Sequence, residues 1–359
     1  MRAPYRVAVW GPGAVGSACI DHVITLSELE LVGVLAYSPS KEGADAGTLI
    51  GRSPCGVKVT TRREAFFAAQ PECVLHTPRD NGDFGSDADV IEMLERGINV
   101  ISSLPYQNLG IRGPEVVRRL EAAAHKGGAT LHGSGINPGF VYERLMLTAT
   151  GLSNEIRHIR AQEMVKIGAE SAEQLIEVCG FGLPPEEARN KPGLSHMWNS
   201  IIHQNIYFAA QVQGLPIERI AHSVELHTTP VTFQAPTMTL AAGTVARMIN
   251  RWDGYSGGRC RYTFECFWYL SEAMRPKEAP CDDYYTITIE GKPSLHLGME
   301  LKASVAENAR FYPHSRLGPV YFATAAALVQ AIPAVVAAPP GLKTIDPPSN
   351  SYWKPDMRA

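Results

Sequence analysis

The sequence contains no cysteine pair with the spacing of a metal or redox motif. Its seven cysteines are scattered along 359 residues, and no two of them stand three positions apart. The odd number favours reduced thiols, and the start of the chain shows no signal-peptide pattern. A phosphate loop ending in G-K-S or G-K-T is also absent, which argues against a P-loop nucleotide-binding protein. We expect a cytoplasmic protein without structural disulfides.

The sequence also has no large excess of acidic or of basic residues. Lysine and arginine number 33 and aspartate and glutamate 36, for a formal net charge of −3, so nucleic acid and anionic membranes are not expected as partners. The most apolar stretch, 321–342, is interrupted by Gln330, Pro333 and a Pro339-Pro340 pair. It predicts a buried helix followed by a loop, not a membrane span. The partner we expect is a small-molecule substrate.

What the chain does have is a regular alternation of short apolar runs and helical patterns in its first third. The expected strands are Tyr5–Trp10, Leu31–Ala36, Cys73–His76, Ile98–Ser102 and Ala129–His132. The expected helices are Ala14–Ser27, Arg63–Ala69, Val90–Arg96 and Pro114–His125. This βαβα rhythm is typical of α/β proteins with a Rossmann-type, doubly wound parallel sheet. Ligands of such sheets bind at the carboxyl ends of the strands.

After residue 138 the pattern changes to long alternating segments. They are Ile156–Lys166, Ile220–Thr228, Thr244–Trp252, Arg261–Leu270 and Tyr284–Glu290, with a helical insertion around 186–213. The pattern predicts an α+β domain with a mainly antiparallel sheet. A chain of this length is expected to hold more than one domain. We expect a dinucleotide-binding domain at 1–138, a substrate domain at 139–315, and a C-terminal helix and tail at 316–359 that return to the first domain.

A glycine-rich turn stands where the first expected strand meets the first expected helix. The turn consists of Gly11, Pro12, Gly13, Ala14, Val15 and Gly16 and has the G-x-G-x-x-G spacing of dinucleotide-binding folds. In that context Gly11 permits the tight turn, Gly13 the close approach of a diphosphate, and Gly16 close packing of helix on strand. The helix N-terminus adds amide donors and partial positive charge. We therefore expect a dinucleotide cofactor at this turn.

The end of the second expected strand bears on the choice between NAD and NADP. NAD-preferring folds place an acid there for the ribose 2′-hydroxyl, but this chain reads YSPSK. Ser38, Ser40 and Lys41 can hold a 2′-phosphate instead, so the sequence favours NADP. NAD remains an alternative, because nothing there repels the unphosphorylated ribose. Further cofactor contacts are expected from His76, Thr77, Ser102, Ser103 and Asn137.

Six further stretches occur in the order of a known family. They are VGVLAYSPSKEGADAGTLIG, GINVISS, HGSGINPGF, CGFGLPPEEA, ITIEGKPSL and AIPAVVAAPPGL. Through them the chain resembles the native amine dehydrogenases and 2,4-diaminopentanoate dehydrogenases, with their dihydrodipicolinate-reductase-like N-terminal domain, from about Tyr5 to Pro348. The resemblance implies a homodimer that uses residues 139–315 for dimerisation. It also implies a nicotinamide-dependent enzyme that interconverts amines with ketones or aldehydes plus ammonia.

One position departs from the family pattern. The family carries a glutamate just after the fifth strand, where it binds the amine nitrogen and stabilises the iminium cation that receives hydride. Here that segment reads Leu104, Pro105, Tyr106 and Gln107, with no acid. Loss of such an electrostatic contact typically costs about 10² to 10³ in rate. Either another acid replaces the glutamate, or the reacting centre is not a cationic iminium.

Three side chains are candidates for the chemistry. Glu163, on the first strand of the second domain, can bind an amine or act as a general base. Tyr106 can donate its hydroxyl proton to a carbonyl oxygen, and His132, at a strand end, can donate a proton or contact the nicotinamide ribose. A structural role is the alternative for each: an ion pair with Arg160 or Lys166 for Glu163, a pocket wall for Tyr106, and a hydrogen bond for His132.

A fairly apolar substrate cavity is expected around the second domain and the last helix. Its candidate residues are Phe140, Met164, Phe181, Trp198, His203 and, by resemblance to the family, Thr324. His196 and His203 are seven residues apart, two turns of a helix, but two histidines alone make a poor zinc site. We expect no metal.

The sequence supports one leading function and two alternatives. The leading one is reductive amination of a small ketone or aldehyde, with Glu163 in place of the missing acid. The first alternative is ammonia-independent reduction of a carbonyl or a preformed imine, with Tyr106 or His132 as proton donor. The second, of another class, is a non-catalytic NADP(H)-binding sensor. Ammonium dependence of turnover separates the first two, and any turnover excludes the third.

Overall fold

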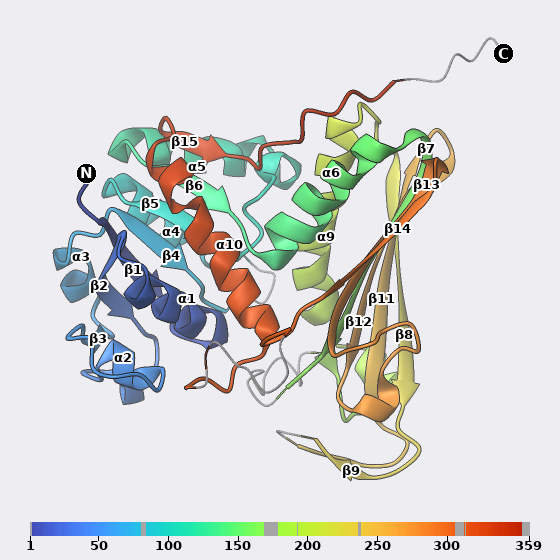
Figure 1. The fold of residues 1–359 in the computed structure, drawn as a ribbon, viewed down its shortest axis with the longest axis horizontal. Helices are drawn as coiled ribbons and strands as arrows, with labels where there is room; N and C mark the ends of the chain where they lie inside the picture. Colours follow the sequence, from blue (N-terminus) through green and yellow to red (C-terminus); the bar gives the residue numbers. More distant parts are fainter. Residues whose placement is uncertain are drawn as a thin grey trace. The chain divides into compact units, whose positions relative to one another are not determined.

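The computed structural model describes residues 2–79, 84–168, 179–191, 193–235, 238–305, 312 and 314–353. The chain forms two compact units (Figure 1). The first unit comprises Met1–Phe140 and Ala303–Ile345, and the second comprises Val141–Lys302 and Asp346–Ala359. The chain therefore leaves the first unit after residue 140 and returns to it for its last long helix.

The first unit is built on a seven-stranded sheet. Its strands are, in spatial order, β15 (Gly341–Lys343), β6 (Thr130–Gly133), β5 (Asn99–Ser102), β4 (Cys73–His76), β1 (Tyr5–Trp10), β2 (Leu29–Leu35) and β3 (Val59–Thr60). All neighbouring pairs are parallel. A parallel sheet covered on both faces needs apolar side chains on both, and Val7, Ala8 and Val9 of β1 are all fully buried.

Helices cover both faces of this sheet (Figure 1). They are α1 (Ala14–Thr25), α2 (Ala46–Leu49), α3 (Arg63–Ala68), α4 (Asp87–Glu95), α5 (Pro114–Gly127) and α10 (Pro319–Val336). Side chains of α1 and α10 share one hydrophobic core with the sheet, and those of α3, α4 and α5 share the core on the opposite side. In α5, Pro114 fills the first turn, where a missing N–H costs nothing, and Gly128 ends the helix with φ of +70°.

Helix α10 is the one helix in the described part of the chain that could cross a membrane by length and composition, with a mean hydropathy of 1.7. Phe322, Leu328 and Ile332 of this helix lie in the core that α10 shares with α1. The apolar sequence of α10 thus has a packing role inside the first unit.

The second unit is a six-stranded mixed sheet. Its strands are, in spatial order, β14 (Leu295–Glu300), β13 (Asp283–Lys292), β7 (Asn154–Lys166), β12 (Arg259–Tyr269), β11 (Val245–Ser256) and β8 (Arg219–Thr228). Within this sheet β7 and β12 are parallel, and the other neighbouring pairs are antiparallel. A short antiparallel pair, β9 (Phe233–Gln234) and β10 (Thr239–Leu240), forms a separate small sheet.

Helix α9 (Gly193–Val212) packs against one face of the second sheet. A Cβ on Gly254 of β11 would lie 2.8 Å from a methyl carbon of Ile206, and Trp252 Nε1 donates to Asn199 over 2.6 Å. Shorter helical elements of the chain are η1 (Pro39–Lys41), η2 (Leu109–Arg112), η3 (Ile136–Leu145), α6 (Met146–Ala149), η4 (Thr150–Leu152), α8 (Pro185–Arg189) and η5 (Glu272–Met274).

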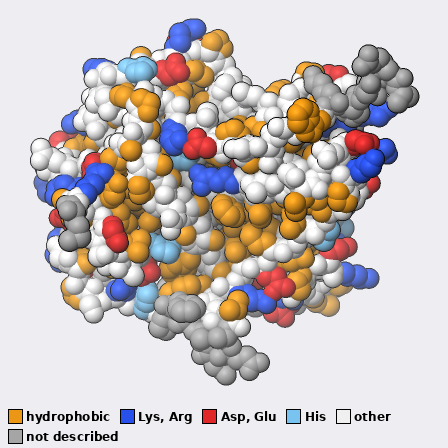
Figure 2. All heavy atoms as spheres, turned by 45° about the horizontal axis from the view of Figure 1, so that its top comes forward, with side chains coloured by type: hydrophobic (Ala, Val, Ile, Leu, Met, Phe, Trp, Pro, Cys, Tyr) orange, Lys and Arg blue, Asp and Glu red, His pale blue; other side chains and the backbone are white. Residues whose placement is uncertain are grey.

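The predicted fold class, a Rossmann-type parallel sheet followed by an α+β unit with a mainly antiparallel sheet, is confirmed. Two details differ. The helical insertion predicted at 186–213 is two helices, α8 and α9, because Asn190 caps the first of them. Strand β2 begins at Leu29, since Leu29 and Glu30 already pair with β1. On the face drawn in Figure 2, acidic and basic side chains are interspersed, as expected from the small net charge.

Candidate functional site

The glycine turn joins β1 to α1 and packs tightly against the end of β4. Gly11 has φ of +92°, and a Cβ there would lie 2.8 Å from the Thr77 carbonyl oxygen. A Cβ on Gly16 would lie 2.2 Å from the Gly11 carbonyl oxygen. The Thr77 hydroxyl donates to that same oxygen over 2.9 Å. Gly11 and Gly16 therefore have no room for a side chain, and Thr77 fixes the turn from behind.

Gly13 differs from the other two glycines of the turn. A Cβ on it would meet no atom within 4 Å, and Gly13 is exposed at the N-cap position of α1. No side chain among the described residues caps this helix, so the amide donors and the partial positive charge of its first turn are available to a ligand. This cradle fits the diphosphate of a dinucleotide.

A cavity of about 600 Å³ adjoins the turn. It is lined by Gly11, Pro12, Gly13, Ala36, Tyr37, Ser38, Lys41, Thr77, Pro78, Arg79, Gly85, Ser86 and Asp89. Most of these residues follow the carboxyl ends of β1, β2 and β4, which are neighbours in the parallel sheet. Doubly wound sheets bind their ligands at this edge.

Lys41 brings a cation to this cavity. Its Nζ donates to the Pro12 carbonyl oxygen over 2.7 Å, and burial lowers the pKa of its ammonium group. The hydroxyl oxygens of Ser38 and Ser40 lie 2.8 Å apart in the same short segment. The structure thus brings Lys41 and Ser38 to the glycine turn, and their contact with a 2′-phosphate stays a prediction.

Sequence reasoning missed seven residues that line the cavity, among them Tyr37, Arg79 and Asp89. The Tyr37 hydroxyl accepts from Trp10 Nε1 over 2.8 Å and donates to Asp89 over 3.3 Å. These bonds hold the ring at the cavity although it is 60% exposed. An aromatic residue directly after the strand end is the signal that could have revealed Tyr37. Asp89 comes from α4 and binds Arg63 over 2.6 Å, a contact that no sequence pattern indicates.

His76 and Ser102 lie deeper than predicted. Both are fully buried, and His76 Nδ1 lies 2.9 Å from Ser102 Oγ. Burial lowers the pKa of His76 to about 3, so the imidazole is neutral. The two side chains hold the ends of β4 and β5 together beside Trp10 and do not line the cavity. The Ser103 backbone joins the same two strand ends by donating to the His76 carbonyl oxygen over 3.0 Å.

Tyr106 is held in the core of the first unit. Its hydroxyl donates to Asp87 over 2.7 Å. Arg112 binds the same carboxylate through both terminal nitrogens, over 3.1 and 2.6 Å. The structure therefore gives the Tyr106 hydroxyl a structural partner, and its role as a proton donor stays a prediction.

His132 lies near the end of β6, and Asn137 follows that strand. His132 is buried, with Nδ1 2.8 Å from the Lys343 carbonyl oxygen of β15. Asn137 is partly buried in η3, where it precedes Pro138. Their roles toward substrate and nicotinamide stay predictions.

Glu163 is a buried acid of the second unit, only 5% exposed. It accepts a hydrogen bond from Trp268 Nε1 over 3.0 Å. On the sheet it is paired with Cys266 of β12 and Tyr285 of β13. Trp198 of α9 packs edge-on against Trp268, with ring centroids 5.1 Å apart. The structure thus brings together two predicted residues, Glu163 and Trp198, through a tryptophan that was not predicted.

Met164 follows Glu163 on β7 and is fully buried. Successive side chains of a strand point to opposite faces, so Met164 faces the other side of the sheet from Glu163, and its contact with a substrate stays a prediction. The same alternation puts Arg160 on the far side of the sheet from Glu163, where it binds Glu265 over 2.6 Å. An ion pair with Arg160 is therefore not the role of Glu163.

The other predicted substrate residues are spread over both units. Phe181 is buried and Phe140 is 40% exposed. His203 is half-buried, and burial together with the neighbouring His222 lowers its pKa. Thr324 lies on α10 of the first unit. Their contacts with a substrate stay predictions.

No cluster of three or more His, Cys, Asp or Glu side chains that could hold a metal occurs among the described residues. The side chain of His196, half of the histidine pair considered from the sequence, lies outside them. All seven cysteines are free thiols.

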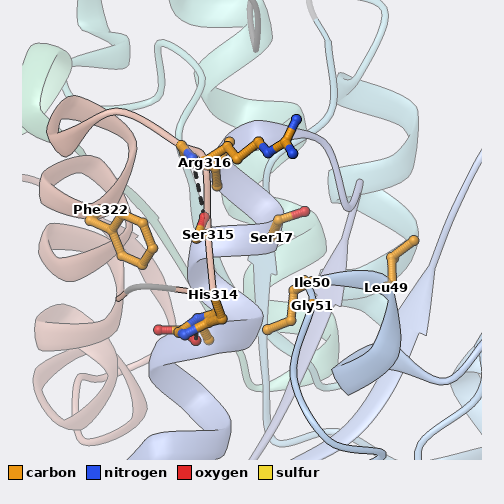
Figure 3. A pocket seen from close by; sticks show the side chains of 10 residues that line it. Ser17, Leu49, Ile50, Gly51, His314, Ser315, Arg316 and Phe322 are labelled. Carbon is orange, nitrogen blue, oxygen red and sulfur yellow. Dashed lines mark hydrogen bonds and ion pairs between the residues drawn. The ribbon is translucent and has the colours of Figure 1, made fainter. Parts of the chain in front are cut away.

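A second cavity, of about 290 Å³, lies in the first unit (Figure 3). Asp21 of α1 binds Arg52 over 3.0 Å and His314 over 2.7 Å beside it. Figure 3 shows His314 and Arg316 on the segment that passes α1 on its way to α10, with Ser17 of α1 close by. The contact between Asp21 and His314 ties the returning segment to α1.

A G-x-G-x-x-G turn at the carboxyl edge of a parallel sheet, followed by an α+β unit with a buried acid, defines a dinucleotide-binding protein of the oxidoreductase type. The family model of the 2,4-diaminopentanoate dehydrogenase C-terminal domain matches residues 140–358. The chain belongs to this family, and the resemblance seen in the sequence is confirmed.

Individual relatives match over most of the chain. An amine dehydrogenase from Streptomyces virginiae is 28% identical over 309 residues, 81% of this chain and 84% of that protein. A 2,4-diaminopentanoate dehydrogenase from Acetoanaerobium sticklandii is 23% identical over 353 residues, 95% of this chain and 92% of that protein. The structure of an amine dehydrogenase from Mycobacterium smegmatis is similar with a TM-score of 0.77 at 22% identity, covering 98% of both chains.

Proposed function

We propose that this protein is an NAD(P)H-dependent oxidoreductase acting on the C=N or C=O carbon of a small, fairly apolar substrate. The glycine turn and the cavity of about 600 Å³ beside it fit a dinucleotide, and the relatives are named amine and diaminopentanoate dehydrogenases. The bound nicotinamide would supply or accept the hydride. The residues of this chain would bind and orient the substrate and provide charge.

NADP is the cofactor we propose, with NAD also accepted. Lys41 supports this choice because its ammonium group lies at the turn, 2.7 Å from the Pro12 carbonyl oxygen, next to the hydroxyl of Ser38. Arg79 adds a second cation to the lining. The acid in the lining, Asp89, is paired with Arg63 over 2.6 Å, which reduces its repulsion of a phosphate.

The reaction we propose first is reductive amination. A ketone or aldehyde, ammonium and NAD(P)H give the amine, NAD(P)⁺ and water: the carbonyl oxygen leaves as water, a C–N bond forms, and hydride adds to the same carbon. Glu163 is the observation that carries this proposal. It is a carboxylate buried among aromatic side chains, and such low-dielectric surroundings strengthen its attraction for a cationic iminium.

Oxidation of NADPH with a panel of small ketones and aldehydes, with and without ammonium, tests this reaction. We expect Glu163→Gln to lower kcat/KM by about 10² to 10³. Glu265→Gln is the matched control, because Glu265 is also buried, at 4% exposed, but lies on the other face of the sheet with Arg160. Equal losses in both variants would assign the effect to packing. Carbonyl reduction that ignores ammonium would exclude reductive amination.

An ammonia-independent carbonyl or preformed-imine reductase is the second candidate, because the segment after β5 carries no acid. Tyr106 or His132 would then donate the proton, and Tyr106→Phe should lower ammonium-free turnover. A non-catalytic NADP(H)-binding sensor would bind NADPH without turning over any carbonyl, and its affinity would not respond to Tyr106→Phe or Glu163→Gln.

A further inference from the structure

Glu163 lies in a lateral row of side chains on one face of the second sheet. Its Cα is paired with that of Cys266 on one side and that of Tyr285 on the other. Directly paired residues of neighbouring strands point to the same face. Trp268, two residues after Cys266, lies on this face as well and donates to Glu163 over 3.0 Å. The neighbours of the carboxylate on this face thus include an indole, a thiol and a phenol.

Tyr142, from η3, packs on the same face. Its ring stacks on Phe264 of β12, with centroids 4.9 Å apart and an interplanar angle of 22°. Tyr142 is 0% exposed and Tyr285 is 1% exposed. Burial raises the pKa of both phenols well above the ordinary value, and nearby charges, that of Glu163 among them, raise it further. Both hydroxyls therefore lie within the field of the Glu163 carboxylate.

Neither of these two hydroxyls has a hydrogen-bond partner within the described ranges of the chain. Buried polar groups are nearly always satisfied by protein, water or a ligand, and a bare hydroxyl in low-dielectric surroundings is costly. Two such hydroxyls near one buried carboxylate indicate that this place holds a small polar group.

The chemistry of the surrounding groups selects what that group is. The Glu163 carboxylate repels an anion. Carboxylate and phenol oxygens accept hydrogen bonds, and the faces of aromatic rings such as those of Tyr142 and Trp268 attract a cation. A small cation with several N–H donors satisfies all of these groups. Ammonium and the primary ammonium group of an amine have this chemistry.

We propose that Glu163, Tyr142 and Tyr285 form the binding site of the amine nitrogen, which holds ammonium before it reacts and the amino group afterwards. The inference rests on the proposed reductive amination and assigns its nitrogen site. Ammonium must lose a proton before its lone pair can form the C–N bond, and Glu163 accepts that proton. The carbonyl π electrons move to oxygen. That oxygen takes one proton from the newly bound nitrogen and then the proton held by Glu163, it leaves as water, and the iminium remains.

Tyr142→Phe and Tyr285→Phe test the site, because each removes one hydroxyl and keeps the ring. At saturating NADPH and ketone we expect KM for ammonium to rise about 10-fold in each variant, while KM for the ketone stays within about twofold. Tyr262→Phe is the matched control, since Tyr262 is a 1% exposed phenol of β12 whose pKa shift does not involve Glu163. An unchanged KM for ammonium in both variants would refute the inference.

Titration of the cofactor-free protein separates this inference from the proposed reaction. Ammonium chloride or ethylammonium chloride is added at constant ionic strength, with sodium chloride as control, and tryptophan fluorescence is followed because Trp268 contacts Glu163. We expect a saturable change that both phenylalanine variants lose and Tyr262→Phe keeps. No such change, or one that survives in both variants, means that buried water satisfies the hydroxyls, and it refutes the inference even if turnover requires ammonium. A saturable change in a protein whose turnover ignores ammonium supports the nitrogen site and refutes reductive amination alone.

Discussion

Two substitutions in the glycine turn separate its part in folding from its part in binding. Gly13→Ala adds a methyl group where no atom lies within 4 Å, on an extended backbone with φ of −81° that alanine can adopt. We expect the free energy of unfolding to change by less than about 1 kcal/mol. Gly16→Ala adds its methyl group 2.2 Å from the Gly11 carbonyl oxygen. The backbone at Gly11 therefore has to move.

The magnitudes follow from these contacts. Overpacking a rigid site costs about 1–3 kcal/mol, and we expect Gly16→Ala at the upper end, because the Thr77 hydroxyl fixes the clashing oxygen. For cofactor affinity we expect the opposite order, with the larger loss in Gly13→Ala. The methyl group of Gly13→Ala stands in the approach to the first amides of α1, and a hydrogen bond to a charged group is worth about 1.5–3 kcal/mol. The loss of one corresponds to a rise of about 10- to 100-fold in Kd.

Urea unfolding at fixed pH measures the free energy of unfolding of each variant, and titration with NADPH measures Kd. The expected pattern is a stable Gly13→Ala protein that binds NADPH weakly beside a destabilised Gly16→Ala protein. If Gly13→Ala binds NADPH like the wild type, the turn is not the diphosphate site. If Gly13→Ala unfolds at the same urea concentration as Gly16→Ala, the premise that a methyl group on Gly13 meets no other atom is wrong.

Two further outcomes follow from single side chains. Lys41→Ala should weaken NADPH binding at least about tenfold more than NADH binding, and equal losses would contradict a 2′-phosphate contact. Burial lowers the pKa of His76 to about 3 from the ordinary value of 6.5, so the unfolded chain binds the extra proton first as the pH falls. The contribution of His76 to stability is therefore complete above pH 6.5 and is lost as the pH drops toward 3. His76→Asn should flatten the dependence of the urea midpoint on pH in that window, and an unchanged slope would show that another group is responsible.

The first unit could be predicted closely because its signals are local. Each buried strand is a short apolar run, and the first one ends at glycines that only a tight turn and close packing explain. The cavity lining was predicted less completely. Tyr37 belongs to it through bonds to Trp10 on β1 and Asp89 on α4. A contact among three separate elements leaves no periodic trace in the sequence.

In the second unit, the order of the strands is what the sequence did not predict. Alternation along β7 already implies that Glu163 and Met164 face opposite sides of the sheet. The row that joins Glu163 to Cys266 and Tyr285 could not be foreseen. It requires β7 to lie between β12 and β13, strands about 100 residues further along the chain, with one neighbour parallel and the other antiparallel. Hydrophobic patterning predicts strands, but it does not predict their order.

Glu163 on β7 lies in low-dielectric surroundings, and an acid in the segment after β5 would do so as well, because Leu104, Tyr106 and Gln107 there are all buried. Glu163 has lost most of its water, and it accepts a hydrogen bond from the N–H of Trp268. Its low-dielectric surroundings strengthen its attraction for a cation. A carboxylate of this kind therefore stabilises the charged states of the reaction more than the neutral ketone, and only such a difference lowers the barrier.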